Sequence, residues 1–267
     1  MIDYLSLTLN LPPDKDYMEY HGKITEDSFR SQMYKYMCQL ERARILFYPH
    51  EFSESRNASM PFTIIILNPK YFDCYEDMES YVYSIFNRSD FEINNLNISR
   101  IDAASDIPGI NVTAIIATLN VKHIRMSTFR IINNTIYAGR NPKVRVYDKL
   151  DEIKGRLKKN LRVIEDEKKL LDLHTDLTRF EVAVSRPKIN LKALQENPVR
   201  LVSYFDKLEF IKMTCSSPCG IMQYMYKHVN RKFRKQMEAL QDMNLLEKIK
   251  ETYISDVIKW FGSEEPF

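Results

Sequence analysis

The segment RNPKVRVYDKLDE, residues 140–152, decides how the chain is expected to fold. Read as a strand, it places its valines on one face and Arg145, Tyr147 and Lys149 on the other. Beyond Lys149 the apolar residues recur at helical spacing, which indicates that a helix follows the strand. A phenol between cations at a strand end is a candidate nucleophile for a phosphodiester. An edge-strand tyrosine among solvated charges fits the same pattern.

Apolar patterns on both sides of this segment predict the rest of the fold. Further strands are expected at 2–11, 61–68 (buried on both faces), 97–107, 129–139 (with a turn near Asn133-Asn134) and 177–185. Helices are expected at 26–42, 74–87 and 111–122, and over most of the chain beyond residue 188. The predicted class is α+β: a mostly antiparallel central sheet of about five or more strands, with helices packed on one face and a helical C-terminal extension.

Composition and charge exclude several function classes. The net charge is +3, so any nucleic-acid contact must come from local clusters of cations. The six glycines show neither the spacing of a phosphate-binding loop nor that of a dinucleotide-binding fold. No apolar run approaches the roughly 18 residues of a membrane span, and the N-terminus lacks the basic region of a signal peptide. These features predict a cytoplasmic protein without membrane association. Cys215 and Cys219 have a metal or redox spacing but lack a second pair.

Carboxylates lie on the polar faces of two predicted strands. Asp102 and Asp106 share one face of strand 97–107, and Glu181 joins Arg179 on the outward face of strand 177–185. Oxygen ligands of this kind suit Mg²⁺ or Mn²⁺, and Mg²⁺ usually takes only one or two carboxylates from a protein. The alternative is ordinary sheet chemistry, with ion pairs for Asp102 and Glu181 and a turn-forming role for Asp106.

Two basic clusters are candidates for DNA contact. The first follows the tyrosine strand and consists of Lys154, Arg156, Lys158 and Lys159. The second, interleaved with aromatic residues, consists of Arg231, Lys232, Arg234 and Lys235. Cations bind phosphates, and aromatic side chains stack on the bases of single-stranded DNA. A solvated helix face is the alternative for both clusters, and a homodimer interface is a further alternative for the second.

Four motifs in this order resemble the filamentous-phage gene II endonuclease and related rolling-circle plasmid initiators. They are MIDYLSLTLNLP (1–12), ISRIDA (98–103), VYDKLDE (146–152) and TRFEVAV (178–184). The resemblance spans roughly residues 1–190, and each motif alone is of low specificity. It implies a phage- or plasmid-encoded enzyme of the host cytoplasm that nicks one DNA strand at a replication origin. The nick leaves a 5′-phosphotyrosine and a free 3′-OH for the host polymerase, and a host helicase is a further expected partner.

The resemblance also assigns roles to individual residues. Tyr147 corresponds to the nucleophile, Asp102 and Glu181 to the metal carboxylates, and Lys149 to the partner of the phosphate or phenolate. Arg145, which the strand pattern and not the resemblance singles out, is a further candidate for that last role, and Asp106 matches the plasmid pattern of metal ligands better than the phage pattern. The histidine–hydrophobic–histidine motif of better-known nickases is absent, so either carboxylates replace it or His123 or His174 completes the site.

These expectations divide the chain into a catalytic region, residues 1–188, and a helical C-terminal region, residues 189–267, for DNA contact or dimerisation. Two rival functions remain. The chain could be a non-catalytic origin-binding regulator of the same fold, or a metal-dependent nuclease that uses water while Tyr147 is structural.

Overall fold

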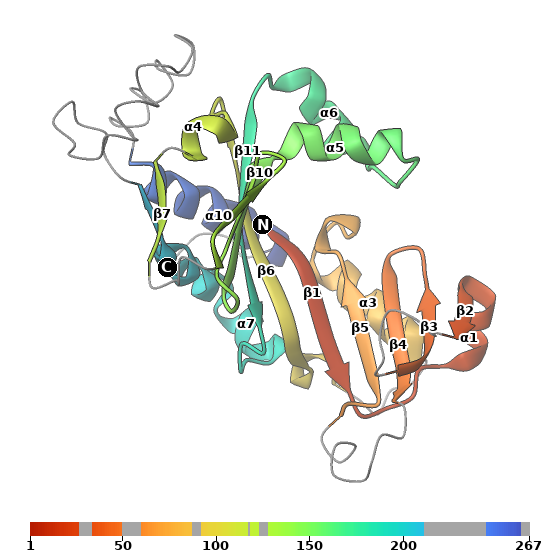
Figure 1. The fold of residues 1–267 in the computed structure, drawn as a ribbon. Coiled ribbons are helices and arrows are strands. Elements are labelled where there is room, and N and C mark those ends of the chain that lie inside the picture. Colours follow the sequence, from red (N-terminus) through yellow and green to blue (C-terminus); the bar gives the residue numbers. More distant parts are fainter. Residues whose placement is uncertain are drawn as a thin grey trace, which may run out of the picture. The chain divides into compact units, whose positions relative to one another are not determined.

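A computed structural model describes residues 1–26, 34–49, 60–86, 92–116, 118–122, 128–210 and 244–262 of the chain. The fold is α+β, with a large antiparallel sheet of ten strands and a C-terminal helix, as predicted (Figure 1). The strand order in the sheet is β2-β3-β4-β5-β1-β6-β11-β10-β9-β8, and β12 pairs with β7 in a separate two-stranded sheet.

The strands have these bounds: β1 (Ile2–Leu9), β2 (Lys23–Glu26), β3 (Tyr34–Gln39), β4 (Ala43–Pro49), β5 (Thr63–Leu67), β6 (Asn97–Pro108), β7 (Leu119–Val121), β8 (Arg130–Ile132), β9 (Thr135–Ala138), β10 (Lys143–Asp148), β11 (Leu177–Ser185) and β12 (Leu208–Phe210). The helices are α1 (Lys15–His21), α3 (Tyr75–Phe86), α4 (Val112–Ile116), α5 (Lys149–Lys158), α6 (Glu165–Leu173), α7 (Leu191–Glu196) and α10 (Leu245–Phe261), and the 3-10 helices are η1 (Pro69–Tyr71), η2 (Ile93–Asn95) and η4 (Pro198–Lys207).

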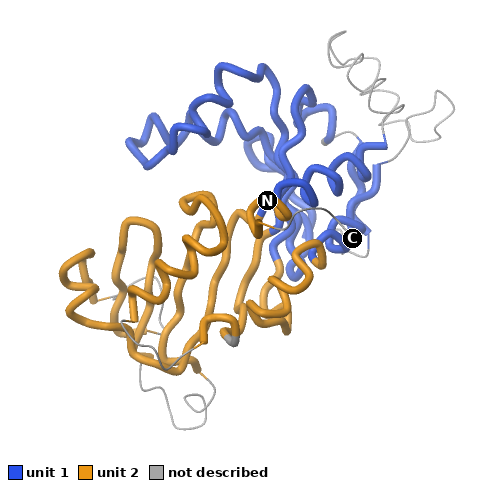
Figure 2. The backbone as a smooth tube through the Cα atoms, turned by 180° about the vertical axis from the view of Figure 1, so that it is seen from behind, with its two compact units in different colours: residues 1, 103–183, 201–256 blue, residues 2–102, 184–200, 257–267 orange. Residues whose placement is uncertain are grey.

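Two compact units, interleaved along the sequence, make up the chain (Figure 2). Unit 1 comprises residues 1, 103–183 and 201–256, and unit 2 comprises residues 2–102, 184–200 and 257–267. The functional division at residue 188 into a catalytic and a C-terminal region stays a prediction.

The core of unit 2 includes buried side chains of strands β1 and β5 and of helix α3. Leu5, Leu7 and Leu9 of β1 are buried, as their alternation predicts. Strand β5 pairs with β1 and β4, and it buries Thr63, Ile65 and Leu67 while the residues between them stay half-buried. Segment 61–68 therefore alternates like a strand with one covered face, and the prediction that both faces are buried is wrong.

The helix predicted at 26–42 is wrong, because strand β3 occupies residues 34–39. Strand β3 pairs with both β2 and β4, and Tyr34 and Cys38 are buried. An apolar pattern this short fits helix and strand alike, and the pairing with two neighbours decides between them. The free thiol of Cys38 is buried, as expected for a structural cysteine.

In unit 1 most of the predicted elements form. The hairpin of β8 and β9 turns at Asn133 and Asn134, which both have positive φ, as a two-residue hairpin turn requires. The helix predicted at 111–122 is shorter than expected: α4 covers Val112–Ile116, and the chain then enters β7.

Two glycines allow a matched test of this packing. A Cβ on Gly22 would lie 2.9 Å from the Gln39 carbonyl oxygen and 2.8 Å from the Cys38 sulfur, whereas a Cβ on Gly155 within α5 would meet nothing within 4 Å. We expect Gly22→Ala to lower the free energy of unfolding by about 1–3 kcal/mol through overpacking. Gly155→Ala should raise it by up to about 1 kcal/mol through helix propensity. Urea unfolding of both variants checks this, and equal stability of the two would contradict the close packing around Gly22.

Candidate active site

Tyr147 is the penultimate residue of strand β10, two residues before helix α5 begins at Lys149. Strand β10 pairs antiparallel with β11, which places Arg145 opposite Glu181 and Tyr147 opposite Arg179. Asp148 ends the strand by capping α5, where its side chain accepts a hydrogen bond from the Asp151 backbone N–H at 3.0 Å. Tyr147 therefore lies close to the junction of strand β10 and helix α5, both in unit 1.

The phenol, a carboxylate and a guanidinium meet at this point. The Tyr147 hydroxyl donates a hydrogen bond to Glu181 Oε2 at 3.5 Å, and Arg145 Nη2 donates to the same oxygen. The Arg145 guanidinium lies 5.2 Å from the centroid of the Tyr147 ring. Tyr147 and Glu181 are 8% and 1% exposed, whereas the Arg145 side chain is 35% exposed. We call these three residues the tyrosine triad.

This arrangement has defined chemical capacities. A carboxylate that accepts a hydrogen bond from a phenol can also accept its proton, and tyrosine needs such help because its reference pKa is near 10. A guanidinium beside both groups stabilises developing negative charge and can pair with a phosphate. The triad therefore has the groups that activation of a phenol for attack on a phosphodiester requires.

Arg179 and Glu181 face the interior of unit 1, contrary to the expectation that this face of β11 is outward. Both are buried, at 2% and 1% exposure. Arg179 donates two hydrogen bonds of 2.6 Å to Asp106, one to each carboxylate oxygen. Asp106 lies within strand β6 and does not initiate a turn, and its carboxylate forms a partly buried bidentate pair with Arg179. The alternation of residues along a strand shows which side chains share a face of the sheet, but it does not show whether other parts of the protein cover that face.

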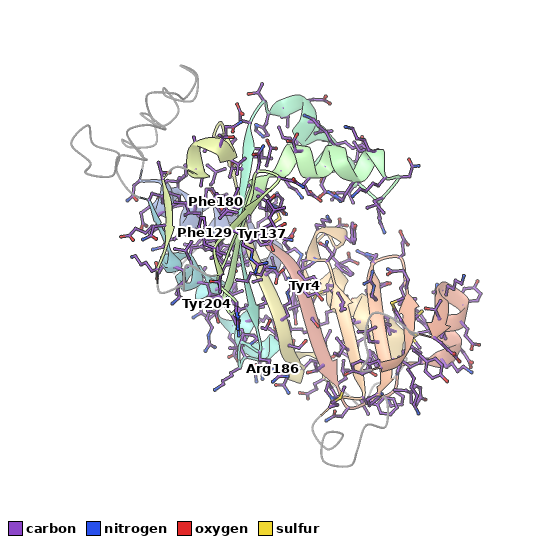
Figure 3. All side chains as sticks on the ribbon, in the orientation of Figure 1. Tyr4, Phe129, Tyr137, Phe180, Arg186 and Tyr204 are labelled. Atoms are coloured by element: carbon purple, nitrogen blue, oxygen red, sulfur yellow. The ribbon has the colours of Figure 1, made fainter. Side chains whose placement is uncertain are left out.

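Asp102 belongs to unit 2 and pairs with Arg100 through hydrogen bonds of 2.8 and 2.6 Å. The Arg100 guanidinium also lies 4.6 Å from the centroid of the Tyr4 ring, a residue labelled in Figure 3. Burial raises the pKa of Tyr4, and the neighbouring Arg100 acts against this rise. Tyr4 is thus a second tyrosine beside an arginine that binds a buried carboxylate. Sequence reasoning missed it because the contact depends on how β1 lies beside β6.

Lys149 lies in a buried ionic network between α5 and α6. Its amine is 2.8 Å from Glu152 and 3.3 Å from Glu167, and its side chain is 2% exposed. Arg156 completes the network, with contacts of 2.6 Å to Glu152 and 2.5 Å to Glu167. Since helix α5 begins at Lys149, the strand alternation that placed this lysine beside Tyr147 ends one residue earlier. We call these four residues the lysine network.

The predicted DNA-contact residues divide into three groups. Lys154, Lys158 and Lys159 are exposed on α5 and at its end. Arg156 belongs to the lysine network: burial opposes its charged form, but Glu167 and Glu152 raise its pKa above the ordinary value. The cluster Arg231, Lys232, Arg234 and Lys235 lies outside the described residues, as do Cys215, Cys219 and His123.

Each predicted metal carboxylate is paired with an arginine: Asp102 with Arg100, Asp106 with Arg179, and Glu181 with Arg145. Over the described ranges, no three His, Cys, Asp or Glu side chains are grouped as a metal site would group them. His174 caps the C-terminus of α6. These carboxylates can still be metal ligands, because one carboxylate has about four lone-pair positions and can bind a guanidinium and a metal ion together. Magnesium also commonly takes only one or two protein ligands.

None of the helices in the described part of the chain is long and apolar enough to span a membrane. No protein-family model matches the chain, and no curated protein matches it by sequence.

Proposed function

We propose that the chain is a metal-dependent, site-specific endonuclease and religase of single-stranded origin DNA that initiates rolling-circle replication. The observation that carries the proposal is the tyrosine triad, in which the Tyr147 hydroxyl and the Arg145 guanidinium share one oxygen of the buried Glu181 carboxylate. The order of the sequence motifs supports the same assignment, because Tyr147 and Glu181 occupy the positions that the resemblance gives to nucleophile and carboxylate.

In the proposed reaction, the Tyr147 oxygen forms a bond to phosphorus while the bond between phosphorus and the 3′ oxygen breaks. Glu181 accepts the phenol proton, and the departing 3′ oxygen takes a proton from water. Arg145 is partly exposed and pairs with a non-bridging phosphate oxygen as charge develops there. The products are a 5′-phosphotyrosine and a free 3′-OH, which the host polymerase extends, and attack by a 3′-OH on the adduct rejoins the strand.

Magnesium or manganese is part of this proposal. Asp106 is the carboxylate of unit 1 that would hold the ion, since Glu181 takes the phenol proton, and ligand roles for Glu181 and Asp102 stay predictions from the resemblance. When bound, such an ion polarises a phosphate oxygen and stabilises the leaving 3′ oxygen. The proposed setting is the cytoplasm of a host cell that carries the phage or plasmid, with a host helicase as a further partner.

A nicking assay tests the proposed function. Supercoiled DNA that contains the intergenic region of the encoding replicon is incubated with the full chain and Mg²⁺ or Mn²⁺. We expect relaxed circles with one 3′-OH at a single position, which a DNA polymerase extends. Binding without nicking at any metal concentration would favour a non-catalytic origin-binding regulator. Nicking that leaves a free 5′-phosphate and no attached protein would favour a water-using nuclease.

The carboxylate of the triad can be tested separately from the phenol. Glu181→Gln keeps the side-chain shape but cannot accept a proton, so nicking should fall by about 10²- to 10⁴-fold, the usual range for general acid–base catalysis. Glu209→Gln is the control, because Glu209 is exposed on β12 and contacts Asn120. Nicking by Glu181→Gln at the control's rate would refute the role of Glu181.

The exposed lysines of α5 are expected to bind DNA phosphates. Replacing Lys154, Lys158 and Lys159 together by Gln should weaken binding of a single-stranded oligonucleotide. Each phosphate contact contributes roughly 0.7 to the slope of log K against log salt for single strands, so the slope should fall by about 2. Fluorescence anisotropy over a salt series measures it, and an unchanged slope would remove these lysines from the DNA path.

A further inference from the structure

A pocket of about 580 Å³ lies in unit 2, beside the end of strand β11. Its apolar lining includes Ile64, Ile98 and Ile189, of which the last two are buried. Polar side chains from other segments complete the lining, among them Asn10 and Asn97. We call it the bulge pocket, after the backbone feature that positions its cations.

That feature is an interruption of strand pairing by two extra residues. The Arg186 backbone N–H donates to the Ser99 carbonyl at 2.7 Å, and the Ile98 N–H donates to the Ile189 carbonyl at 3.1 Å. Between these two hydrogen bonds β6 moves by one residue, from Ser99 to Ile98, whereas the segment that follows β11 moves by three residues, from Arg186 to Ile189. Pro187 and Lys188 therefore have no counterpart on β6. Bulges of this kind redirect side chains and are concentrated near functional sites.

Both cations of the bulge have a backbone conformation that L-residues rarely adopt. The φ angles are 52° at Arg186 and 57° at Lys188, and both side chains line the pocket. A non-glycine residue held at positive φ costs of order 1–3 kcal/mol, and such residues cluster at ligand-binding sites. Arg186 is labelled in Figure 3, beyond the end of β11.

Four polar side chains of this pocket are exposed and are not paired with one another. Arg186, Lys188, Asn10 and Asn97 are all exposed. Throughout the ranges that the structure describes, their side chains make no hydrogen bond or ion pair. Two cations and two amides thus line one cavity beside an apolar wall, and they form no hydrogen bonds with each other.

We infer that the bulge pocket binds one nucleotide of a single DNA strand. The base packs against the isoleucines, the amides of Asn10 and Asn97 hydrogen-bond its edge, and Arg186 and Lys188 bind the flanking phosphates. Amides pair well with base edges, and cations with an apolar platform suit unpaired nucleotides. The two cations and the apolar wall of the pocket favour an anionic ligand with a flat apolar face. The choice of a DNA strand as that ligand rests on the proposed function.

The test is anisotropy of a fluorescein-labelled 12-mer of deoxythymidine with the full chain, in a salt series. Arg186→Ala combined with Lys188→Ala should weaken binding roughly tenfold and lower the salt slope by about 1.4, since each single-strand phosphate contact contributes about 0.7. Lys192→Ala, which removes an exposed lysine of α7 in the same unit, is the control. A double variant that matches this control in affinity and slope would overturn the inference.

Two further arms remove ambiguity. Arg186→Gly removes the cation and also relieves the strain of the positive φ. It should bind the oligonucleotide as weakly as Arg186→Ala does, but it should unfold at a higher urea concentration than Arg186→Ala. Free dTMP is the other probe: micromolar binding of dTMP by a chain that does not bind the oligonucleotide would show a mononucleotide site and overturn the assignment to a DNA strand. Covalent adduct formation at Tyr147 is scored separately, so loss of the adduct with intact pocket binding would refute the proposed function alone.

Discussion

Tyr147→Phe is expected to abolish covalent attachment to DNA and to lower nicking by roughly a thousandfold or more, as loss of a catalytic nucleophile does. The substitution removes one hydroxyl, which donates to Glu181, and keeps the ring that packs beside Arg145. Because the ring is 8% exposed and stays in place, the free energy of unfolding should change little. Oligonucleotide affinity should also be retained, since phosphate contacts and not the phenol supply most of the binding energy.

Tyr4→Phe is the matched control for this prediction. Tyr4 also lies beside an arginine that binds a buried carboxylate, with the Arg100 guanidinium 4.6 Å from its ring centroid. Tyr4→Phe should nick DNA at the wild-type rate. Loss of activity in Tyr4→Phe together with normal activity in Tyr147→Phe would transfer the nucleophile to Tyr4 and contradict the role proposed for the tyrosine triad.

Glu167→Ala is expected to destabilise the protein by about 3–5 kcal/mol, the usual cost of removing one partner from a buried ion pair. Glu167 contacts both Lys149 and Arg156, which are 2% and 15% exposed in their side chains. Its carboxylate also accepts a bond from the Ile164 backbone N–H at the start of α6. Its loss therefore removes an ion-pair partner from the buried Lys149 and from the half-buried Arg156, and it removes a helix cap.

Glu165→Ala on the same helix provides the control for the lysine network. Glu165 pairs with Lys168 at the surface, where such substitutions usually change stability by less than about 0.5 kcal/mol. Thermal and urea unfolding of both variants give the comparison. Equal stability of the two variants would contradict the stabilising role expected for Glu167 in the lysine network.

Local patterns predict much of the fold. Alternation correctly places Leu5, Leu7 and Leu9 in the core. The change of period beyond Lys149 predicts a helix after the tyrosine strand, and α5 begins at Lys149 itself. Short apolar patterns do not distinguish a helix from a strand where pairing with neighbouring strands determines the structure. Residues 34–39 are an example, because they form a strand between β2 and β4.

The residues of the candidate site can be predicted from the sequence, but their contacts cannot. Strand patterns and motifs single out Arg145, Tyr147 and Glu181, and the structure brings these three together in unit 1. The pairing of Arg145 with Glu181 depends on the register between two strands, across a sequence separation of 36 residues. The strand period does not extend to Lys149, because Asp148 caps α5 and the helix begins at this lysine.

Peptide mapping of the trapped adduct tests the nucleophilic role of Tyr147 most directly. The full chain is incubated with single-stranded DNA from the origin region and Mg²⁺, the DNA is digested to nucleotides, and tryptic peptides are analysed by mass spectrometry. We predict a single modified peptide that carries a nucleotide 5′-phosphate on Tyr147. A nucleotide on any other residue, or efficient nicking with no modified peptide, would contradict that role.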